Sequence, residues 1–301
     1  MTAVTSAPDV WISSAQWPTT SAAGDAAAEL EDLGVGTLWL GSADPSLALP
    51  ERLLRATRRM RVATGIVNLW TADPDALAAR RAELDEDFGD RFVLGLGMAH
   101  AANVETTGQR YVRPYAKLVD YLDRLDAAPR PVPAAGRVLA ALGPRAIALA
   151  GERTAGAHPY LTTPEHTAQA RSILGPGPLL VPEQKVVLDP DPSAARATAR
   201  EAVRYYLQLP NYTRNLARHG FTADDLAGAG SDRLIDALVA QGDEQAAVRR
   251  VEAHRAAGAD AVAVQIVTAT GRQGPLPLPE LRRLLPALTE AGQDTRCSSR
   301  T

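Results

Sequence analysis

The sequence predicts an α/β fold, a (β/α)8 TIM barrel in which eight parallel strands alternate with helices. Short apolar runs bounded by turn residues recur along the chain, and segments with apolar residues at helical spacing separate them. These runs are apolar throughout, which is typical of parallel strands buried on both faces. The length of 301 residues suits one such barrel. The alternative, a doubly wound open sheet, would place a G-x-G-x-x-G turn after the first strand, and the sequence has none there.

The first half of the chain contains four predicted strand–helix pairs. The third pair has clear boundary signals, because Asp73 can cap the free N–H groups of a helix, Pro74 suits its first position, and Gly89 can end it. We expect the strands at residues 10–13, 35–40, 61–66 and 92–96, and the helices at residues 24–33, 46–60, 76–88 and 111–125.

The second half contains four more strand patterns and one long strandless segment. Pro182 interrupts the seventh strand, and residues 191–242 are expected to form a helical insertion after that strand. The strands are expected at residues 138–142, 156–160, 179–188 and 260–267, and the helices at residues 143–152, from 163 onward, at 243–257 and at 279–291. We assign residues 9–292 to a single domain and expect residues 1–8 and 293–301 to be disordered tails.

Composition excludes several classes of function. A net charge of −3 gives no electrostatic reason to bind nucleic acid or an anionic membrane. No apolar run approaches the roughly 20 residues of a membrane span, and the N-terminus lacks the pattern of a signal peptide. The single cysteine, Cys297, excludes an intramolecular disulfide and favours a reducing, cytoplasmic setting. No Cys/His group has the spacing of a metal site, so no metal is expected.

Polar side chains near the carboxyl ends of the predicted strands mark the candidate site, because barrel enzymes build their sites there. The set has few carboxylates, which argues against a glycosidase, and lacks the ligands of a metal-dependent hydrolase. Small residues and neutral donors suit a planar cofactor that supplies its own redox chemistry. The residues expected to line the substrate are Ser14, Ser42, Trp70, His158 and Tyr160.

Three further features each allow two interpretations. Gly95 and Gly97 end the fourth strand and form either a tight turn or the floor of a site. The segment 143–145 begins a helix after the fifth strand, so its free N–H groups are either simply capped or bind an anion. His100 follows the fourth strand as either a general acid/base or a structural loop histidine. The remaining histidines, His166, His219 and His254, are expected on the surface of helices.

These motifs together resemble the luciferase-like monooxygenase superfamily, in particular the branch that uses the deazaflavin coenzyme F420. The resemblance covers roughly residues 9–270, and several later segments are similar to an actinobacterial subgroup of that branch. Residues 64–68 read T-G-I-V-N and match a family strand that carries a non-prolyl cis peptide, here implied between Gly65 and Ile66. Residues 91–97 read R-F-V-L-G-L-G and match the next wall of the family's site. The loop after the second strand, G-S-A-D at residues 41–44, lacks the Asp-His pair of the sugar-phosphate dehydrogenases, so that substrate is not implied.

The resemblance implies an oxidoreductase that transfers a hydride between C5 of the deazaflavin and an unidentified small organic substrate. It also implies a bacterial-luciferase-like barrel and a homodimer. His100 would move a proton, and nine residues would hold the cofactor: Gly65, Ile66, Asn68, Met98, Ala99, Asn103, Gly143, Pro144 and Arg145. Two alternatives stay open, an FMN-dependent monooxygenase on the same barrel and a non-catalytic protein that binds a flavin or deazaflavin.

Overall fold

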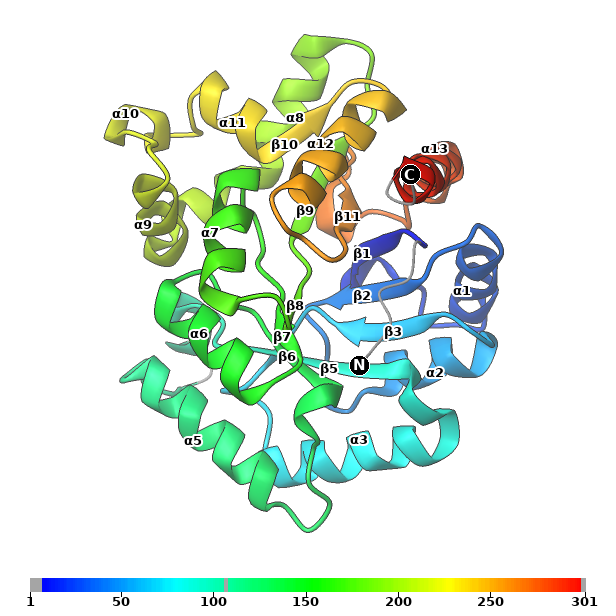
Figure 1. Cartoon of the computed structure of the whole chain (residues 1–301), viewed down its shortest axis with the longest axis vertical. Coiled ribbons are helices and arrows are strands. Elements are labelled where there is room, and N and C mark those ends of the chain that lie inside the picture. The colour runs from blue at the N-terminus through cyan, green and yellow to red at the C-terminus, as the bar shows by residue number, and fades with distance from the viewer. Residues whose placement is uncertain (1–6, 106–107, 299–301) are drawn as a thin grey trace.

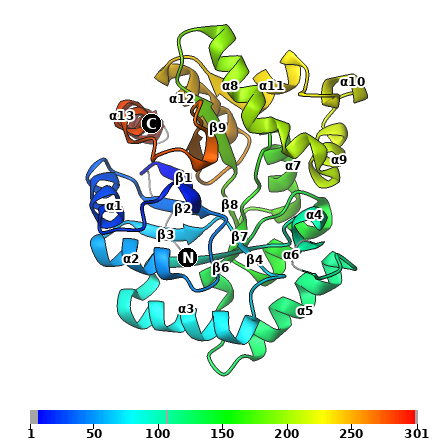
Figure 2. The ribbon, with the colours of Figure 1, turned by 180° about the vertical axis from the view of Figure 1, so that it is seen from behind.

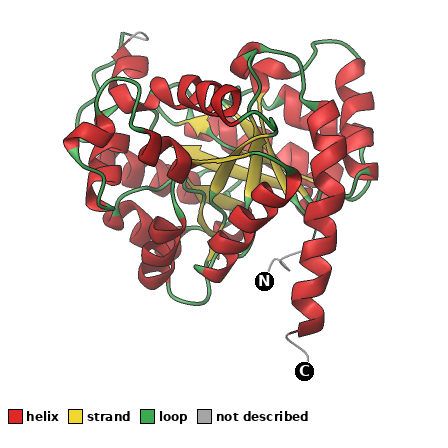
Figure 3. Ribbon diagram, turned by 90° about the horizontal axis from the view of Figure 1, so that it is seen from above, coloured by secondary structure: helices red, strands yellow, loops and turns green. Residues whose placement is uncertain are grey.

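A single curled parallel sheet surrounded by helices forms the centre of the molecule (Figures 1 and 3). The parallel strands and the helices between them confirm the predicted α/β class. The computed structural model describes residues 7–105 and 108–298. The strands are β1 (Asp9–Ser13), β2 (Thr37–Gly41), β3 (Arg61–Thr64), β4 (Val67–Asn68), β5 (Phe92–Gly97), β6 (Arg137–Leu139), β7 (Gly156–Ala157), β8 (Leu179–Leu180), β9 (Glu183–Val187), β10 (Val239–Gln241) and β11 (Ala263–Ile266).

The strand order is β10-β9-β11-β1-β2-β3-β5-β6-β7-β8, with β4 paired to β5. The last strand of this order, β8, is continuous along the chain with β9, the strand next to its other end, because only residues 181–182 separate them. Val181 N donates to Ala157 O beside β7, and Asp260 N donates to Leu180 O on the side of β11. Hydrogen bonds from both neighbours thus reach this segment, and Pro182 lies at the interruption that the sequence predicted.

The helices alternate with the strands and cover the outside of the sheet (Figure 2). Proline at the first turn and an extended residue before it begin several of them, as Asp73 and Pro74 do for α3. The helices are α1 (Ala22–Asp32), α2 (Ala48–Ala56), α3 (Pro74–Phe88), α4 (Ala101–Glu105), α5 (Pro114–Ala127), α6 (Pro144–Arg153), α7 (Pro164–Leu174), α8 (Pro192–Arg204), α9 (Pro210–Arg218), α10 (Ala223–Leu226), α11 (Asp232–Leu238), α12 (Glu244–Ala256) and α13 (Leu278–Ser298).

One strand contradicts the prediction that residues 191–242 are strandless. β10 lies in this segment and pairs in parallel with β9, Val239 opposite Lys185. It was missed because its three residues follow α11 without a turn signal, so the apolar pattern reads as one continuing helix. Helices α8 to α11 precede it and pack in a separate apolar cluster with the strand residues Val187 and Val239 and with Val267, which follows β11.

Small and aromatic side chains fill the interior of the sheet. Trp11 and Trp39 project inward from β1 and β2 and pack with alanine and valine from the facing strands. Trp39 Nε1 donates to Asp9 Oδ2 at 3.0 Å, which fixes its ring. The ring of His158 stacks on Trp39 with 4.1 Å between centroids and 17° between planes. This stack places His158 beneath the carboxyl ends of the strands.

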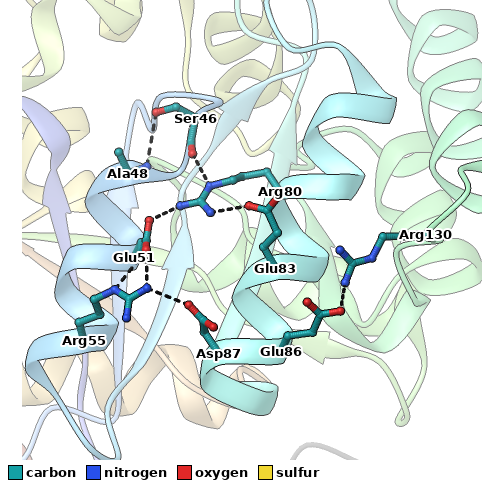
Figure 4. Close-up of polar contacts among 9 residues, drawn as sticks. All are labelled: Ser46, Ala48, Glu51, Arg55, Arg80, Glu83, Glu86, Asp87 and Arg130. Carbon is teal, nitrogen blue, oxygen red and sulfur yellow. Dashed lines mark hydrogen bonds and ion pairs between the residues drawn. The ribbon is translucent and has the colours of Figure 1, made fainter.

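A network of ion pairs joins α2 to α3 on the outer surface (Figure 4). Glu51 accepts from Arg55 and Arg80, while Arg55 also pairs with Asp87. Arg80 Nε donates to Ser46 O at 2.9 Å. Exposed pairs contribute only about 0–1 kcal/mol each to the free energy of unfolding. The main consequence of the network is therefore to hold the position of a loop. It anchors the loop after β2, which reaches the candidate site.

The ends of the chain test the predicted tails only in part. α13 continues to Ser298, beyond the helix end expected at residue 291. Residues 1–6 and 299–301 lie outside the described residues, so disorder of the tails stays a prediction. Within the described part of the chain, no helix combines the length and apolar character needed to cross a membrane.

Candidate active site

A cavity of about 830 Å³ lies at the carboxyl ends of the strands. This volume is within the range of pockets that hold a cofactor or a drug-sized ligand. Two groups of residues line it. The strand-end wall consists of Gly65, Ile66, Asn68, Met98, Ala99, Gly143, Pro144 and Arg145. The tyrosine–arginine cluster consists of Trp11, Tyr160, Tyr206, Tyr212 and Arg272.

A cis peptide bond joins Gly65 to Ile66 at the edge of this cavity. The prediction of a non-prolyl cis bond at this position is therefore confirmed. The bond lies between β3 and β4, where the strand breaks and then pairs again with β5. Gly65 N donates to Leu40 O at 2.7 Å, so neighbouring strand β2 holds the break in place.

The two glycines of β5 allow this break to pack closely. A Cβ on Gly95 would lie 1.8 Å from Thr64 O, and a Cβ on Gly97 would lie 2.7 Å from Ile66 Cγ1. The Thr64 hydroxyl also donates to Gly95 O and accepts from Gly95 N, both at 2.8 Å. Both glycines lie inside β5, so they do not form a tight turn, and they are needed for close approach between strands. Gly97 also lines the cavity, and its role as the floor of a site stays a prediction.

His158 presents an unpaired nitrogen beside the cis bond. Its Nδ1 lies 2.7 Å from Val181 O, which can only accept, so Nδ1 carries the proton and Nε2 is an acceptor. Burial lowers the pKa of His158 to about 4, and the bond to Val181 opposes this shift. Nε2 has no partner among the described residues and lies 3.2 Å from the position of a Cβ on Gly65. A bound ligand could therefore donate a hydrogen bond to a neutral imidazole here.

His100 also lines the cavity, at the start of α4 and 5.5 Å from the ring of Tyr212. Burial lowers the pKa of His100 below its ordinary 6.5, and the charge of Arg272 lowers it further, while a hydrogen bond with Asn211 raises it. Its Nδ1 is buried without a partner among the described residues. The side chain is thus neutral at pH 7 and has a free ring nitrogen.

The beginning of α6 forms the cationic end of the cavity. Gly143 precedes Pro144 with extended backbone and no side-chain cap. Pro144 has no N–H and Ala146 N donates to Gly143 O at 3.0 Å, so the N–H of Arg145 is the first-turn donor left for a ligand. A Cβ on Gly143 would lie 3.8 Å from Arg218 Nη1, and Arg145 and Arg214 also line the cavity. A helix N-terminus with arginines beside it favours an anion such as a phosphate.

Two predicted site residues do not line this cavity, and for a third the side chain lies outside the described residues. Ser14 lies in a smaller neighbouring pocket shared with Ser42, and its hydroxyl is buried without a partner among the described residues. Trp70 is buried, and its ring packs against Tyr111 with 5.3 Å between the ring centroids. Asn103 belongs to α4, but its side chain lies outside the described residues. Ser42, His158 and Tyr160 do line the cavity.

The expected surface positions of two histidines were wrong. His166 and His254 are 1% and 0% exposed, because α7 and α12 pack these faces against the sheet and each other. His254 contacts Thr167 and Gln184 through its two ring nitrogens. His219 is partly exposed, 5.2 Å from the ring of His166.

Sequence reasoning missed most of the tyrosine–arginine cluster. Trp11 lies within β1 rather than after it, so the strand-end rule did not select it. Tyr206 and Tyr212 belong to the segment after β9, and Arg272 follows β11. The one available signal was the aromatic segment around residues 205–212, because a helix on the surface would not be expected to carry so many aromatic side chains. No group of three potential metal ligands was found among the described residues.

Comparisons with known proteins agree with this architecture. Residues 1–130 match the family model described as luciferase-like monooxygenase, which confirms the predicted resemblance over this part of the chain. A Mycobacterium tuberculosis protein provisionally named a coenzyme F420-dependent oxidoreductase is 32% identical over 117 residues. That match covers 38% of this chain and 33% of the relative, so the chain spans about a third of the relative's length.

Solved structures resemble the whole chain at low identity. The coenzyme F420-dependent tetrahydromethanopterin reductase of Methanopyrus kandleri has a TM-score of 0.71 at 18% identity, over 95% of this chain and 97% of that one. The oxygenating constituent of 3,6-diketocamphane monooxygenase of Pseudomonas putida, in complex with FMN, has a TM-score of 0.69 at 14% identity, over 95% and 98%. At these identities the likeness establishes the fold.

Proposed function

We propose that this chain, whose first 130 residues match the luciferase-like monooxygenase family, is a coenzyme F420-dependent oxidoreductase. It would transfer a hydride between C5 of the deazaflavin and a small organic substrate. The observation that carries the proposal is the cavity of about 830 Å³ at the carboxyl ends of the strands, with the start of α6 and the arginines Arg145 and Arg218 at one end. The relative provisionally named an F420-dependent oxidoreductase and the F420-dependent reductase of the same fold support this choice of cofactor.

The residues present fit such a cofactor. Ile66 and the small residues Gly97 and Ala99 line one wall of the cavity and could contact a planar ring. Asn68 Oδ1 accepts from Trp70 N at 3.0 Å, so its amide nitrogen is the group that could donate to the cofactor. The N–H of Arg145 at the start of α6, with the guanidinium groups of Arg145 and Arg218 beside it, would hold the phosphate. When bound, the deazaflavin supplies the carbon that gives or accepts the hydride.

His100 is the residue that we propose to move a proton. Its lowered pKa keeps the ring neutral at pH 7, and its Nδ1 is free. A neutral imidazole can take a proton from a substrate hydroxyl or return it in the reverse direction. Ser42, His158 and Tyr160 would line the substrate, with His158 Nε2 as an acceptor.

An FMN-dependent monooxygenase is the second candidate, because the camphane monooxygenase with bound FMN has the same fold. The α6 N-terminus could hold the phosphate of either cofactor. A fluorescence titration of the purified protein with F420, run beside FMN, separates them. We expect saturable F420 binding at low micromolar concentration and weaker FMN binding.

Other outcomes of the titration would overturn the proposal in defined ways. A preference for FMN with substrate-dependent oxygen consumption would assign the monooxygenase function. Tight F420 binding without any change in cofactor absorbance under a range of donors and acceptors would assign a non-catalytic binding protein. Binding of neither cofactor would remove the assignment of the cavity.

The resemblance also implies a homodimer and a single domain, and both stay proposals. Light scattering after size-exclusion chromatography measures the first. A mass of two chains supports the homodimer, and a mass of one chain, 31.9 kDa, contradicts it. Limited proteolysis that releases residues 188–242 as a stable fragment would contradict the single domain.

A further inference from the structure

Arg272 is a cation inside the cavity that lacks an acidic partner. It follows β11, is partly buried, and its guanidinium lies 5.6 Å from the ring centroid of Trp11. Among the described residues, no carboxylate forms an ion pair with it. Its Nε is buried and has no hydrogen-bond partner among them. A buried charge without a counter-ion is costly, so such a group usually belongs to a site that a ligand completes.

The other two nitrogens of Arg272 are held in place by hydroxyl groups. Nη1 donates to Tyr206 OH at 2.6 Å, and Nη2 donates to Ser42 Oγ at 3.1 Å. Tyr206 OH donates in turn to Tyr160 OH at 3.0 Å. The guanidinium is therefore fixed by neutral groups, which orient it without neutralising its charge.

A buried ion pair anchors the far end of this chain of hydrogen bonds. Tyr160 OH donates to Gln265 Oε1 at 2.9 Å, and Lys185 Nζ donates to the same oxygen at 3.1 Å. Lys185 also pairs with Glu183 at 3.0 Å. Arginine and lysine can only donate, so every bond in the chain points toward Gln265. Both tyrosine protons are committed, and the tyrosines act as positioning residues for Arg272.

Glu183 is not an ion-pair partner of Arg272, although its charge contributes to the raised pKa of Arg272. Its Oε1 is occupied by Lys185 and its Oε2 accepts from Leu161 N at 3.0 Å. Asp44 lines the same cavity, but its Oδ1 accepts from Ser46 N at 2.9 Å and it forms no ion pair with Arg272. The positive charge of Arg272 is thus left for whatever enters the cavity.

We propose that Arg272 makes this site selective for substrates with a carboxylate attached to a planar group. The carboxylate would accept from the guanidinium, and the rings of Trp11, Tyr160, Tyr206 and Tyr212 would contact the planar part. The anion of the cofactor would bind at the other end, beside Gly143 and Arg218. This inference rests on the proposed function and names the substrate class of the same site.

The test uses two probes of one shape, trans-cinnamate and trans-cinnamamide, which differ in charge. Isothermal titration calorimetry of the wild-type protein saturated with F420 measures the affinity of each. We expect cinnamate to bind about 10- to 100-fold more tightly, which is the range for a charge-assisted hydrogen bond. Equal affinities, or tighter binding of cinnamamide, would overturn the proposal without any variant.

Variants then assign the selectivity to Arg272. Arg272→Gln should remove the preference for cinnamate, Arg272→Lys should keep part of it, and Tyr206→Phe should reduce it a few-fold because one anchor of the guanidinium is lost. The matched control is Arg218→Gln, which removes a cation from the other end of the cavity. It should weaken F420 binding and leave the preference for cinnamate unchanged.

The pattern of results separates this inference from the proposed function. Cinnamate selectivity that needs Arg272 in a protein that does not bind F420 would support the subsite and contradict the cofactor assignment. F420 binding without cinnamate selectivity would support the cofactor assignment and contradict the subsite. If Arg272→Gln weakens F420 instead of cinnamate, Arg272 belongs to the cofactor site and the proposal is wrong.

Discussion

The strand-end wall and the tyrosine–arginine cluster face one cavity but are built differently. The wall is made by backbone: a cis bond, glycines that allow close approach, and a helix N-terminus. The cluster is made by side chains that a chain of hydrogen bonds connects to the buried pair of Lys185 and Glu183. The wall should therefore tolerate few changes of shape, and the cluster few changes of charge.

The largest effect on stability is expected from breaking the buried ion pair to which the cluster is connected. Lys185→Met would leave Glu183, which is 0% exposed, without its cation. We expect a loss of about 3–5 kcal/mol in unfolding free energy, measured by urea denaturation. Lys185→Met with Glu183→Gln should regain part of this loss, because glutamine needs no counter-ion and can still accept from Leu161. A double variant as unstable as the single one would contradict the account.

A change of shape tests the strand-end wall. In Gly95→Ala the added Cβ would meet the backbone oxygen of Thr64 at 1.8 Å, which no rotamer change can relieve. We expect a loss of about 3 kcal/mol and weaker F420 binding, because strands β3 and β5 must separate. Gly177→Ala is the control, since nothing lies within 4 Å of its Cβ position. Equal stability of the two variants would show that the wall is not built by close approach.

Lowering the pH should reduce the unfolding free energy through His158, which lies where the strand-end wall and the tyrosine–arginine cluster meet. Its folded pKa of about 4 lies below the ordinary 6.5, so the unfolded chain binds a proton first as pH falls. Its neutral form therefore favours folding above pH 6.5, and this contribution is lost between pH 6.5 and 4. We expect His158→Asn to lose about 2 kcal/mol less than wild type between pH 7 and 5. Parallel pH profiles would show that His158 titrates normally.

The smallest effect on stability is expected from Tyr206→Phe. The variant keeps the ring and its packing but removes one hydroxyl from the chain of hydrogen bonds that ends at Arg272. A loss of about 1 kcal/mol is expected in thermal or urea unfolding. A loss as large as that of Lys185→Met would mean that the hydroxyl, and not the ion pair, anchors the cluster.

The same difference explains what the sequence could predict. The wall follows buried strands directly along the chain, so the glycines at 65, 95 and 97 and the segment 143–145 could be placed by the strand-end rule and by resemblance. Nothing in the local pattern places Arg272 beside Tyr206, because 66 residues separate them and their contact depends on how α8 to α11 pack. β10 was missed for a related reason, since its three residues become a strand only by pairing with β9.

The most direct measurement concerns Gly143, where the wall is proposed to hold the cofactor phosphate. Gly143→Glu adds a carboxylate at the start of α6, where Arg218, at 3.8 Å, is the non-adjacent described residue within 4 Å of the Cβ position and the backbone suits any residue. The new charge should stabilise the helix and occupy the anion site. We predict an unchanged or higher melting temperature and F420 binding weaker by about 10-fold or more, with Gly177→Glu unaffected. F420 affinity equal to that of wild type in Gly143→Glu would contradict the assignment of this cavity to the deazaflavin.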